Sequence, residues 1–194
     1  MEEVIRPKGV RPIHLVLIAI VAAINTIASI AATVIQPFPG KAFIYLPVAV
    51  MPVFGIWFGP WALIGGILSG VLYAPFWGMP IHFGFISGFS DAYLGLIPWI
   101  AFKALKINPE LKTIKDYLAY FIFIVGITVT SEQLVYSAMS AYIFGFFPPS
   151  MIIAVTVAAI PGALIGTFPL SLILLKALSG FVKKTPLYVK GWIF

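Results

Sequence analysis

Six long stretches of apolar residues, separated by short polar or proline-containing connections, dominate the chain. They cover residues 12–34, 42–58, 60–77, 81–105, 116–144 and 150–178. Most are long enough to cross a hydrocarbon core of about 30 Å as helices that rise about 1.5 Å per residue. Because polarity does not alternate from one residue to the next, the pattern predicts helices and not the strands of a membrane barrel.

Proline and glycine residues mark the ends of these stretches and identify one weak span. Residues 42–58 form a short stretch that contains Pro47 and Pro52, so we expect it to be kinked or partly unwound. Gly59 and Pro60 follow directly and predict a tight reversal into the next span. The pattern as a whole predicts an all-α membrane protein, a compact bundle of six transmembrane helices that forms a single integral membrane domain over residues 1–194.

The composition excludes several classes of protein. Of the 194 residues, 61% are hydrophobic and only 9% are charged, and the mean hydropathy is +1.08. A soluble domain of this size would lack the polar surface that keeps it dissolved, and a disordered chain would be far more polar. Nucleic-acid binding is disfavoured because the pI of 9.6 rests on few charges. The lack of cysteine excludes disulfides, thiolate metal sites and cysteine nucleophiles.

Basic residues are distributed unevenly about the predicted spans. They precede the first span, surround the connection between the fourth and fifth, and follow the sixth: Arg6, Lys8, Arg11, Lys103, Lys106, Lys112, Lys115, Lys176, Lys183, Lys184 and Lys190. Only Lys41 falls on the other side. The positive-inside rule then predicts a multi-pass protein of the cell membrane with both termini in the cytoplasm.

Two acidic residues, Asp91 and Glu132, lie inside apolar spans, where charge is costly and usually functional. Asp91 lies about ten residues, roughly 15 Å, from the outer end of its span. Glu132 lies about sixteen residues, roughly 24 Å, from the inner end of its own. Both are therefore expected in the middle-to-outer layer. Asp91 could instead bond helix backbone or a neighbouring serine, and Glu132 could be a protonated group between helices or face a water-filled vestibule.

Polar and aromatic side chains at this depth complete a candidate substrate site. An apolar cavity with a few convergent polar groups is typical of small-molecule sites, and acids with aromatic walls favour a cationic or hydrogen-bond-donating ligand. Trp77 could serve only as an interfacial anchor, and His82 as a loop residue. The predicted substrate-binding residues are Asn25, Lys41, Trp77, His82, Asp91, Glu132, Gln133 and Tyr136.

No catalytic pattern is found along the chain. There is no HExxH motif, no Ser/His/Asp arrangement, no cluster with metal-ligand spacing and no Walker A sequence. We therefore expect no enzymatic activity and no cofactor or metal. Any ATP hydrolysis linked to this protein would belong to another subunit.

Small residues recur four positions apart, the spacing that lets membrane helices approach closely. The glycine pairs favour close packing within the bundle: Gly55 and Gly59, Gly66 and Gly70, Gly84 and Gly88, Gly162 and Gly166. Ala19 and Ala23 lie in the inner half of the first span. They could pack internally or form a docking surface for another membrane subunit.

These features together carry a family resemblance that covers nearly the whole chain. Residues 56–70 (IWFGPWALIGGILSG) are similar to a short second span, a Gly-Pro turn and a glycine-rich third span. Residues 88–95 (GFSDAYLG) are similar to a fourth-span region, and residues 19–23 (AIVAA) fit an alanine-xxx-alanine motif. With its size and predicted topology, the chain resembles the substrate-binding S components of energy-coupling factor (ECF) transporters.

The resemblance implies a function and partners. Such a protein would bind a vitamin or related micronutrient from outside with high affinity, beneath loops around Lys41 and Met79. A transmembrane coupling subunit, contacted through the alanine motif, and ATPase subunits would then reorient it to release the ligand inside. The two acids favour a cation such as a thiamin-like compound, because an anionic vitamin would require a basic residue and only Lys41 is available.

Two other functions compete with this interpretation. A stand-alone secondary transporter could use Asp91 or Glu132 as a proton carrier, although no internal repeat is visible. A membrane enzyme is disfavoured by the missing catalytic pattern. A structural membrane subunit would leave both buried acids without a use.

Overall fold

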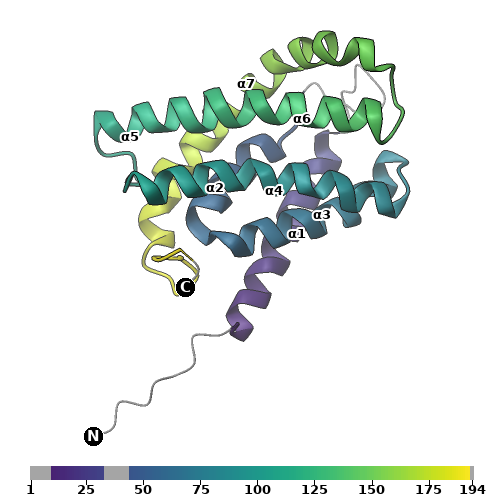
Figure 1. Ribbon diagram of the computed structural model, residues 1–194. Coiled ribbons are helices and arrows are strands. Elements are labelled where there is room, and N and C mark those ends of the chain that lie inside the picture. The colour runs from purple at the N-terminus through teal and green to yellow at the C-terminus, as the bar shows by residue number, and fades with distance from the viewer. Residues whose placement is uncertain (1–9, 33–43, 193–194) are drawn as a thin grey trace, which may run out of the picture.

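The computed structural model describes residues 10–32 and 44–192. Within these ranges most of the chain is helical and no strand occurs (Figure 1). The elements follow one another in the order α1 (Pro12–Ala31), α2 (Pro47–Phe58), α3 (Pro60–Tyr73), η2 (Ala74–Trp77), α4 (Ile81–Ala104), α5 (Ile114–Ala119), η3 (Tyr120–Thr128), α6 (Val129–Tyr142), η4 (Pro149–Met151) and α7 (Ile152–Val182).

Five helical segments are long and apolar enough to cross a membrane. Within the described ranges they are Pro12–Ala31, Pro60–Trp77, Ile81–Ala104, Ile114–Tyr142 and Pro149–Val182. The prediction of an all-helical, multi-pass membrane protein is therefore confirmed at this level. The expected end of the first span, at residues 33–34, lies outside the described residues.

The short second stretch forms a helix that is enclosed by the others. Helix α2 has 12 residues, about 18 Å, and is too short to cross the hydrocarbon core by itself. All of its residues are buried, and it packs against α4 and α7. Of the described part of this stretch, residues 44–46 are not helical, in agreement with partial unwinding. Pro47 begins α2, where its missing N–H is not needed, and the helix continues without a break through Pro52.

The turn between α2 and α3 depends on a glycine. Gly59 adopts a φ of 57°, a left-handed conformation that other residues rarely take, and Pro60 then begins α3. The predicted tight reversal is confirmed. The two members of the glycine pair therefore differ in role: Gly55 packs against Gly95 of α4, whereas Gly59 forms the turn.

Glycine also brings α3 and α4 together, backbone against backbone. A Cβ atom built on Gly70 would lie 2.6 Å from Gly88 Cα and would overlap the Gly84 carbonyl oxygen. A Cβ atom on Gly66 would lie 3.1 Å from the backbone nitrogen of Ala92. The predicted close packing is therefore confirmed for these pairs. It holds the segment around Asp91 firmly against α3.

The segments α5, η3 and α6 form one long helix (Figure 1). Thr113 caps its first turn, with its hydroxyl accepting a hydrogen bond from the Asp116 backbone N–H at 3.3 Å. The middle segment, η3, is π-helical, a wider winding that often accompanies functional sites in membrane and soluble helices. Glu132 and Gln133 lie just beyond it, on α6.

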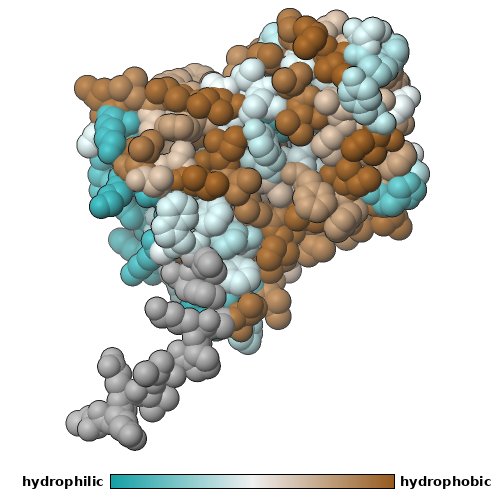
Figure 2. All heavy atoms as spheres, viewed as in Figure 1, coloured by the Kyte–Doolittle hydropathy of each residue, from teal (hydrophilic) through white to brown (hydrophobic). Residues whose placement is uncertain are grey.

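The basic residues of the described chain gather at one end of the bundle. Lys183, after α7, donates a hydrogen bond to Glu110, in the α4–α5 connection, at 2.7 Å. Lys103, near the end of α4, donates to the Lys190 carbonyl at 3.1 Å. Figure 2 shows hydrophobic residues over much of the visible face, with hydrophilic residues mainly towards its ends. Arg6 and Lys8 lie outside the described residues.

The ionic contacts of Glu110 at this end of the bundle can be tested through the pH dependence of stability. Hydrogen bonds from Lys112 and Lys183 lower the pKa of Glu110 from 4.5 to about 2. Ionised Glu110 therefore stabilises the fold above pH 4.5, and this contribution is lost as the pH falls towards about 2. We expect wild type to melt at a higher temperature than Glu110→Gln above pH 4.5, and this difference in melting temperature to disappear on acidification. Unfolding in detergent, followed by tryptophan fluorescence, measures both melting temperatures. A difference that does not change with pH would contradict the prediction.

Candidate functional site

Asp91 is the centre of a buried hydrogen-bond network between α1, α3 and α4. Its Oδ1 atom accepts a hydrogen bond from the Tyr45 hydroxyl at 2.8 Å. Its Oδ2 atom accepts from Asn25 Nδ2 at 2.8 Å and from Ser69 Oγ at 3.3 Å. The carboxyl group is thus bonded to side chains from three other segments of the chain. Asp91 thus bonds a serine, which was one of the alternatives to a ligand-binding role, but this serine, Ser69, lies on α3 and is distant in the sequence.

This network fixes the orientation of Asn25. Its Nδ2 group donates to Asp91 and also to Ser69 Oγ, at 2.7 Å, so both amide hydrogens are used. The Oδ1 atom must then point away from the carboxyl group. It is buried and accepts no hydrogen bond, and the whole residue has no exposed surface. A buried acceptor of this kind has an unmet need for a donor.

Aromatic side chains extend the network. The Tyr45 hydroxyl lies 3.3 Å from that of Tyr73, which in turn lies 3.1 Å from Ser87 Oγ. The Trp77 ring stands edge-on to the Tyr45 ring, with centroids 6.0 Å apart, and its Nε1 donates to the Ser29 carbonyl at 3.2 Å. Asp91 is therefore linked to a wall of three aromatic rings.

Glu132 occupies the next position across the bundle, on α6. Its Oε1 atom accepts from Ser90 Oγ at 2.8 Å, and its Oε2 atom accepts from Gln133 Nε2 at 2.7 Å. Because Ser90 precedes Asp91 in α4, one serine joins the surroundings of the two acids.

Most of the predicted substrate-binding residues therefore fall into one region. Asn25, Asp91, Glu132 and Gln133 are buried together, with Tyr136 and Trp77 half-buried beside them.

The other predicted residues lie elsewhere. His82 is exposed at the start of α4, where its ring contacts Phe83, and it belongs to none of the hydrogen bonds above. Lys41 lies outside the described residues. Ala19 and Ala23 are exposed on α1, away from the core.

Three contributors were not among the predicted site residues. Tyr45 and Ser69 bond Asp91 directly, and Ser90 bonds Glu132. Hydroxyl groups inside apolar spans were the available signal. Their partners, however, depend on the rotation of each helix, which the length and polarity of a span do not define.

The site offers acceptors and rings to a ligand but no metal cage. No group of three or more His, Cys, Asp or Glu side chains with metal-binding geometry occurs among the residues that the structure describes. Asp91, Glu132 and Asn25 Oδ1 are acceptors, and none of the hydrogen bonds described above to the two acids comes from a Lys or Arg side chain. Comparison of the chain with protein-family models, with curated proteins and with solved structures found no match.

Proposed function

We propose that the protein is the membrane-embedded substrate-capture subunit of an ECF-type importer. In this proposal it binds a vitamin-like micronutrient from outside, and a coupling subunit and ATPases complete transport. The observation that carries it is the buried acceptor cluster of Asp91, Glu132 and Asn25 Oδ1, set beside aromatic rings in a chain that otherwise avoids polarity. The resemblance described above supplies the class of transporter and the partners.

The chemistry of the cluster favours a ligand that donates hydrogen bonds or carries positive charge. Two carboxyl groups and an unpaired amide oxygen accept from N–H or O–H groups, and the rings of Tyr45, Tyr73 and Trp77 attract cations through their faces. An anion would meet two acids and no neighbouring cation among the described residues of the site. The substrate class is therefore a cationic or amine-bearing micronutrient.

A binding titration tests this function. Purified protein in detergent is titrated with a panel of vitamins and their precursors, cations first, while the tryptophan fluorescence is followed. One compound should bind saturably with one site per chain. Glu132→Gln should weaken it by at least about tenfold, because a charge-assisted hydrogen bond of about 1.5–3 kcal/mol would be lost.

The matched control for this experiment is Glu110→Gln. It makes the same chemical change at the basic end of the bundle and should leave the affinity unchanged. An absence of binding across the panel by folded, ligand-free protein would contradict the proposed function. Binding that Glu132→Gln leaves intact would remove Glu132 from the site.

The exposed alanines of α1 provide a test of the partner. Leucine at both Ala19 and Ala23 would fill the space that a closely packed helix needs. We expect this double variant to bind ligand normally but to lose ATP-dependent uptake when co-expressed with the coupling and ATPase subunits. Ala31→Leu, also exposed on α1 but near its other end, is the control. Normal uptake by the double variant would exclude this docking face.

One observation favours a second function, that of a proton-coupled secondary transporter. The hydroxyl groups of Tyr45, Tyr73 and Ser87 form a hydrogen-bonded series that starts at Asp91, an arrangement suited to moving a proton. Flux of the ligand into liposomes, driven by a pH gradient without any partner, would support this alternative. Flux that requires ATPase subunits supports the capture subunit.

A further inference from the structure

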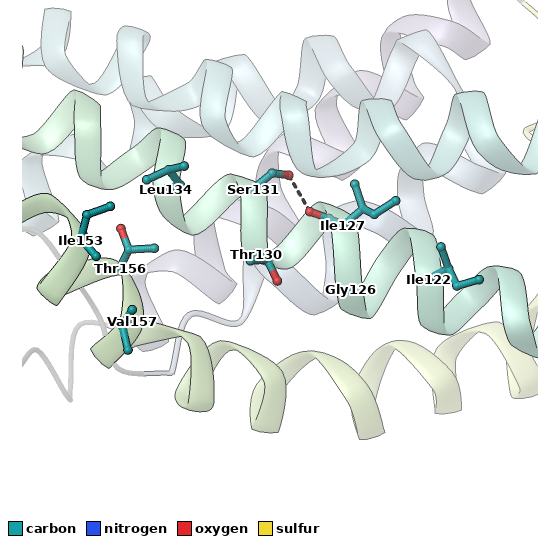
Figure 3. Close-up of a pocket in the computed structure, with 9 residues that line it drawn as sticks. All are labelled: Ile122, Gly126, Ile127, Thr130, Ser131, Leu134, Ile153, Thr156 and Val157. Atoms are coloured by element: carbon teal, nitrogen blue, oxygen red, sulfur yellow. Dashed lines mark hydrogen bonds between the residues drawn. The ribbon is translucent and has the colours of Figure 1, made fainter.

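A groove runs along the outer side of the long η3–α6 helix, where α7 diverges from it. Figure 3 shows its two walls, with Ile122 and Leu134 near the ends of one and Ile153, Thr156 and Val157 on the other. Its volume is about 710 Å³, and its lining is almost entirely apolar. Glu132 and its partners do not line it. The groove is therefore separate from the candidate substrate site.

The groove opens onto the surface that would face lipid. Ile153 and Val157 are 66% and 61% exposed, and Ile122 is 50% exposed. The residues that line it belong to η3, α6 and α7. Because the groove is open on this apolar side, an occupant can enter it from the bilayer.

One polar group in the groove has an unmet hydrogen bond. Thr156 is only 6% exposed, and its hydroxyl has no hydrogen-bond partner. Its side chain projects from α7 towards α6 (Figure 3). Hydrocarbon tails cannot satisfy a hydroxyl group, so the occupant needs an acceptor at this level. This requirement excludes a purely apolar filling.

The dimensions indicate what the occupant is. From Ile122 to Leu134 the groove follows twelve residues of helix, at most about 18 Å because the π-helical part rises less per residue. One leaflet of the hydrocarbon core is about 15 Å thick, whereas a transmembrane helix would need contact over about 30 Å. The length therefore matches a single lipid chain better than a helix.

The depth of Thr156 agrees with this assignment. The η4–α7 segment, Pro149–Val182, has 34 residues and is therefore about 50 Å long, well beyond the hydrocarbon core. The segment contains Pro161 and Pro169 and changes direction along its length, so its ends alone do not define its depth (Figure 1). Thr156 lies about 10 Å from Pro149, close to the α6–α7 connection, where the chain turns back into the bundle. We therefore infer that Thr156 lies near one edge of the hydrocarbon core, where the ester or ether oxygens of glycerolipids lie.

We propose that this groove binds one hydrocarbon chain of a glycerolipid. The lipid belongs to the leaflet on the side of the α6–α7 connection. Its ester or ether oxygen accepts a hydrogen bond from the Thr156 hydroxyl, and its chain follows the groove towards Ile122. The proposal does not depend on the transport function, because it concerns the opposite face of α6.

Photolabelling in vesicles tests this site. The protein is reconstituted in phosphatidylcholine vesicles that contain a small fraction of phosphatidylcholine with a diazirine on one acyl chain. After irradiation, labelled peptides are mapped by mass spectrometry. We expect labelling of the groove residues to exceed that of other exposed apolar positions several-fold. Val157→Phe should reduce it several-fold by filling the groove, and Thr156→Val should reduce it by removing the donor without changing the shape.

Matched controls separate these effects from general disturbance. Val16→Phe makes the first change at an exposed position of α1, and Thr26→Val removes another buried hydroxyl that lacks a partner. Both should leave groove labelling unchanged. Even labelling over all lipid-facing helices would overturn the proposal, as would labelling that both groove variants leave intact. Cross-links between two protein molecules at the groove, in place of lipid labelling, would show that a helix of another molecule occupies it. That result would also overturn the proposal. Because Thr156→Val preserves volume, it keeps the test valid if Val157→Phe does not fold.

Discussion

Alanine in place of Gly70 should destabilise the protein by about 3 kcal/mol, the upper part of the range for overpacked cores. The new methyl group would overlap the Gly84 carbonyl oxygen and crowd Gly88 Cα, and both obstacles are backbone atoms that cannot rotate away. Relief requires α3 and α4 to separate. For a chain of this size the loss corresponds to a fall of roughly 10 °C in melting temperature.

Thermal unfolding of the detergent-solubilised protein measures this effect, and the chain provides a matched control. Gly180 is also helical, but a Cβ atom there would meet only Glu110 Cδ, at 4.0 Å. Gly180→Ala should therefore melt at or slightly above the wild-type temperature, because alanine favours a helix more than glycine does. Equal melting temperatures for the two alanine variants would show that α3 and α4 are not in backbone contact.

Replacement of Asp91 by alanine should have a comparable effect for a different reason. Tyr45 and Asn25 would each lose a buried acceptor at 2.8 Å, whereas Ser69 would keep its hydrogen bond to the Gly66 carbonyl at 2.7 Å. A buried donor left without a partner costs about 1–3 kcal/mol, so we expect a loss of about 3 kcal/mol. Ligand binding should fall as well, since Asn25 would no longer be held with its Oδ1 atom free.

A double-mutant cycle distinguishes this network from simple loss of packing. Tyr45→Phe removes a single hydrogen bond to Asp91 and keeps the ring that contacts Trp77. In wild type it should destabilise the protein, whereas in the Asp91→Ala background it should do so much less. The expected coupling is about 0.5–3 kcal/mol. Additive effects of the two substitutions would mean that the bond between them contributes nothing.

The sequence was sufficient to predict the helices because the length of an apolar run determines whether it can cross a membrane. Residues 60–77 and the start of α4 at Ile81 agree with the structure for this reason. The behaviour of α2 was not predictable from its prolines alone. Enclosure by α4 and α7 keeps it helical past Pro52, and such tertiary contacts are invisible in a local pattern.

The proximity of the two acids was predictable, but their hydrogen-bond partners were not. Counting residues along each span placed Asp91 and Glu132 at a similar level, and the structure links their surroundings through Ser90. Their depth in the membrane stays a prediction. Such counting did not reveal that Ser69 bonds Asp91 or that Ser90 bonds Glu132. Those pairings require knowing which face each helix turns towards its neighbours. His82 was included for its expected level in the span, yet its side chain is exposed and contacts Phe83.

The glycine contacts between α3 and α4 also determine which parts of the molecule can move. Backbones that touch directly cannot slide past one another, so α3 and α4 behave as one rigid body that carries Asp91. Glu132 belongs to α6, which is joined to α4 by the Ser90–Glu132 and Tyr93–Ser131 hydrogen bonds, among other contacts. Any shift of α6 relative to this body therefore changes the separation of the carboxyl groups. Two serine hydroxyls, one on each side of this boundary, connect such a shift to the surroundings of both acids.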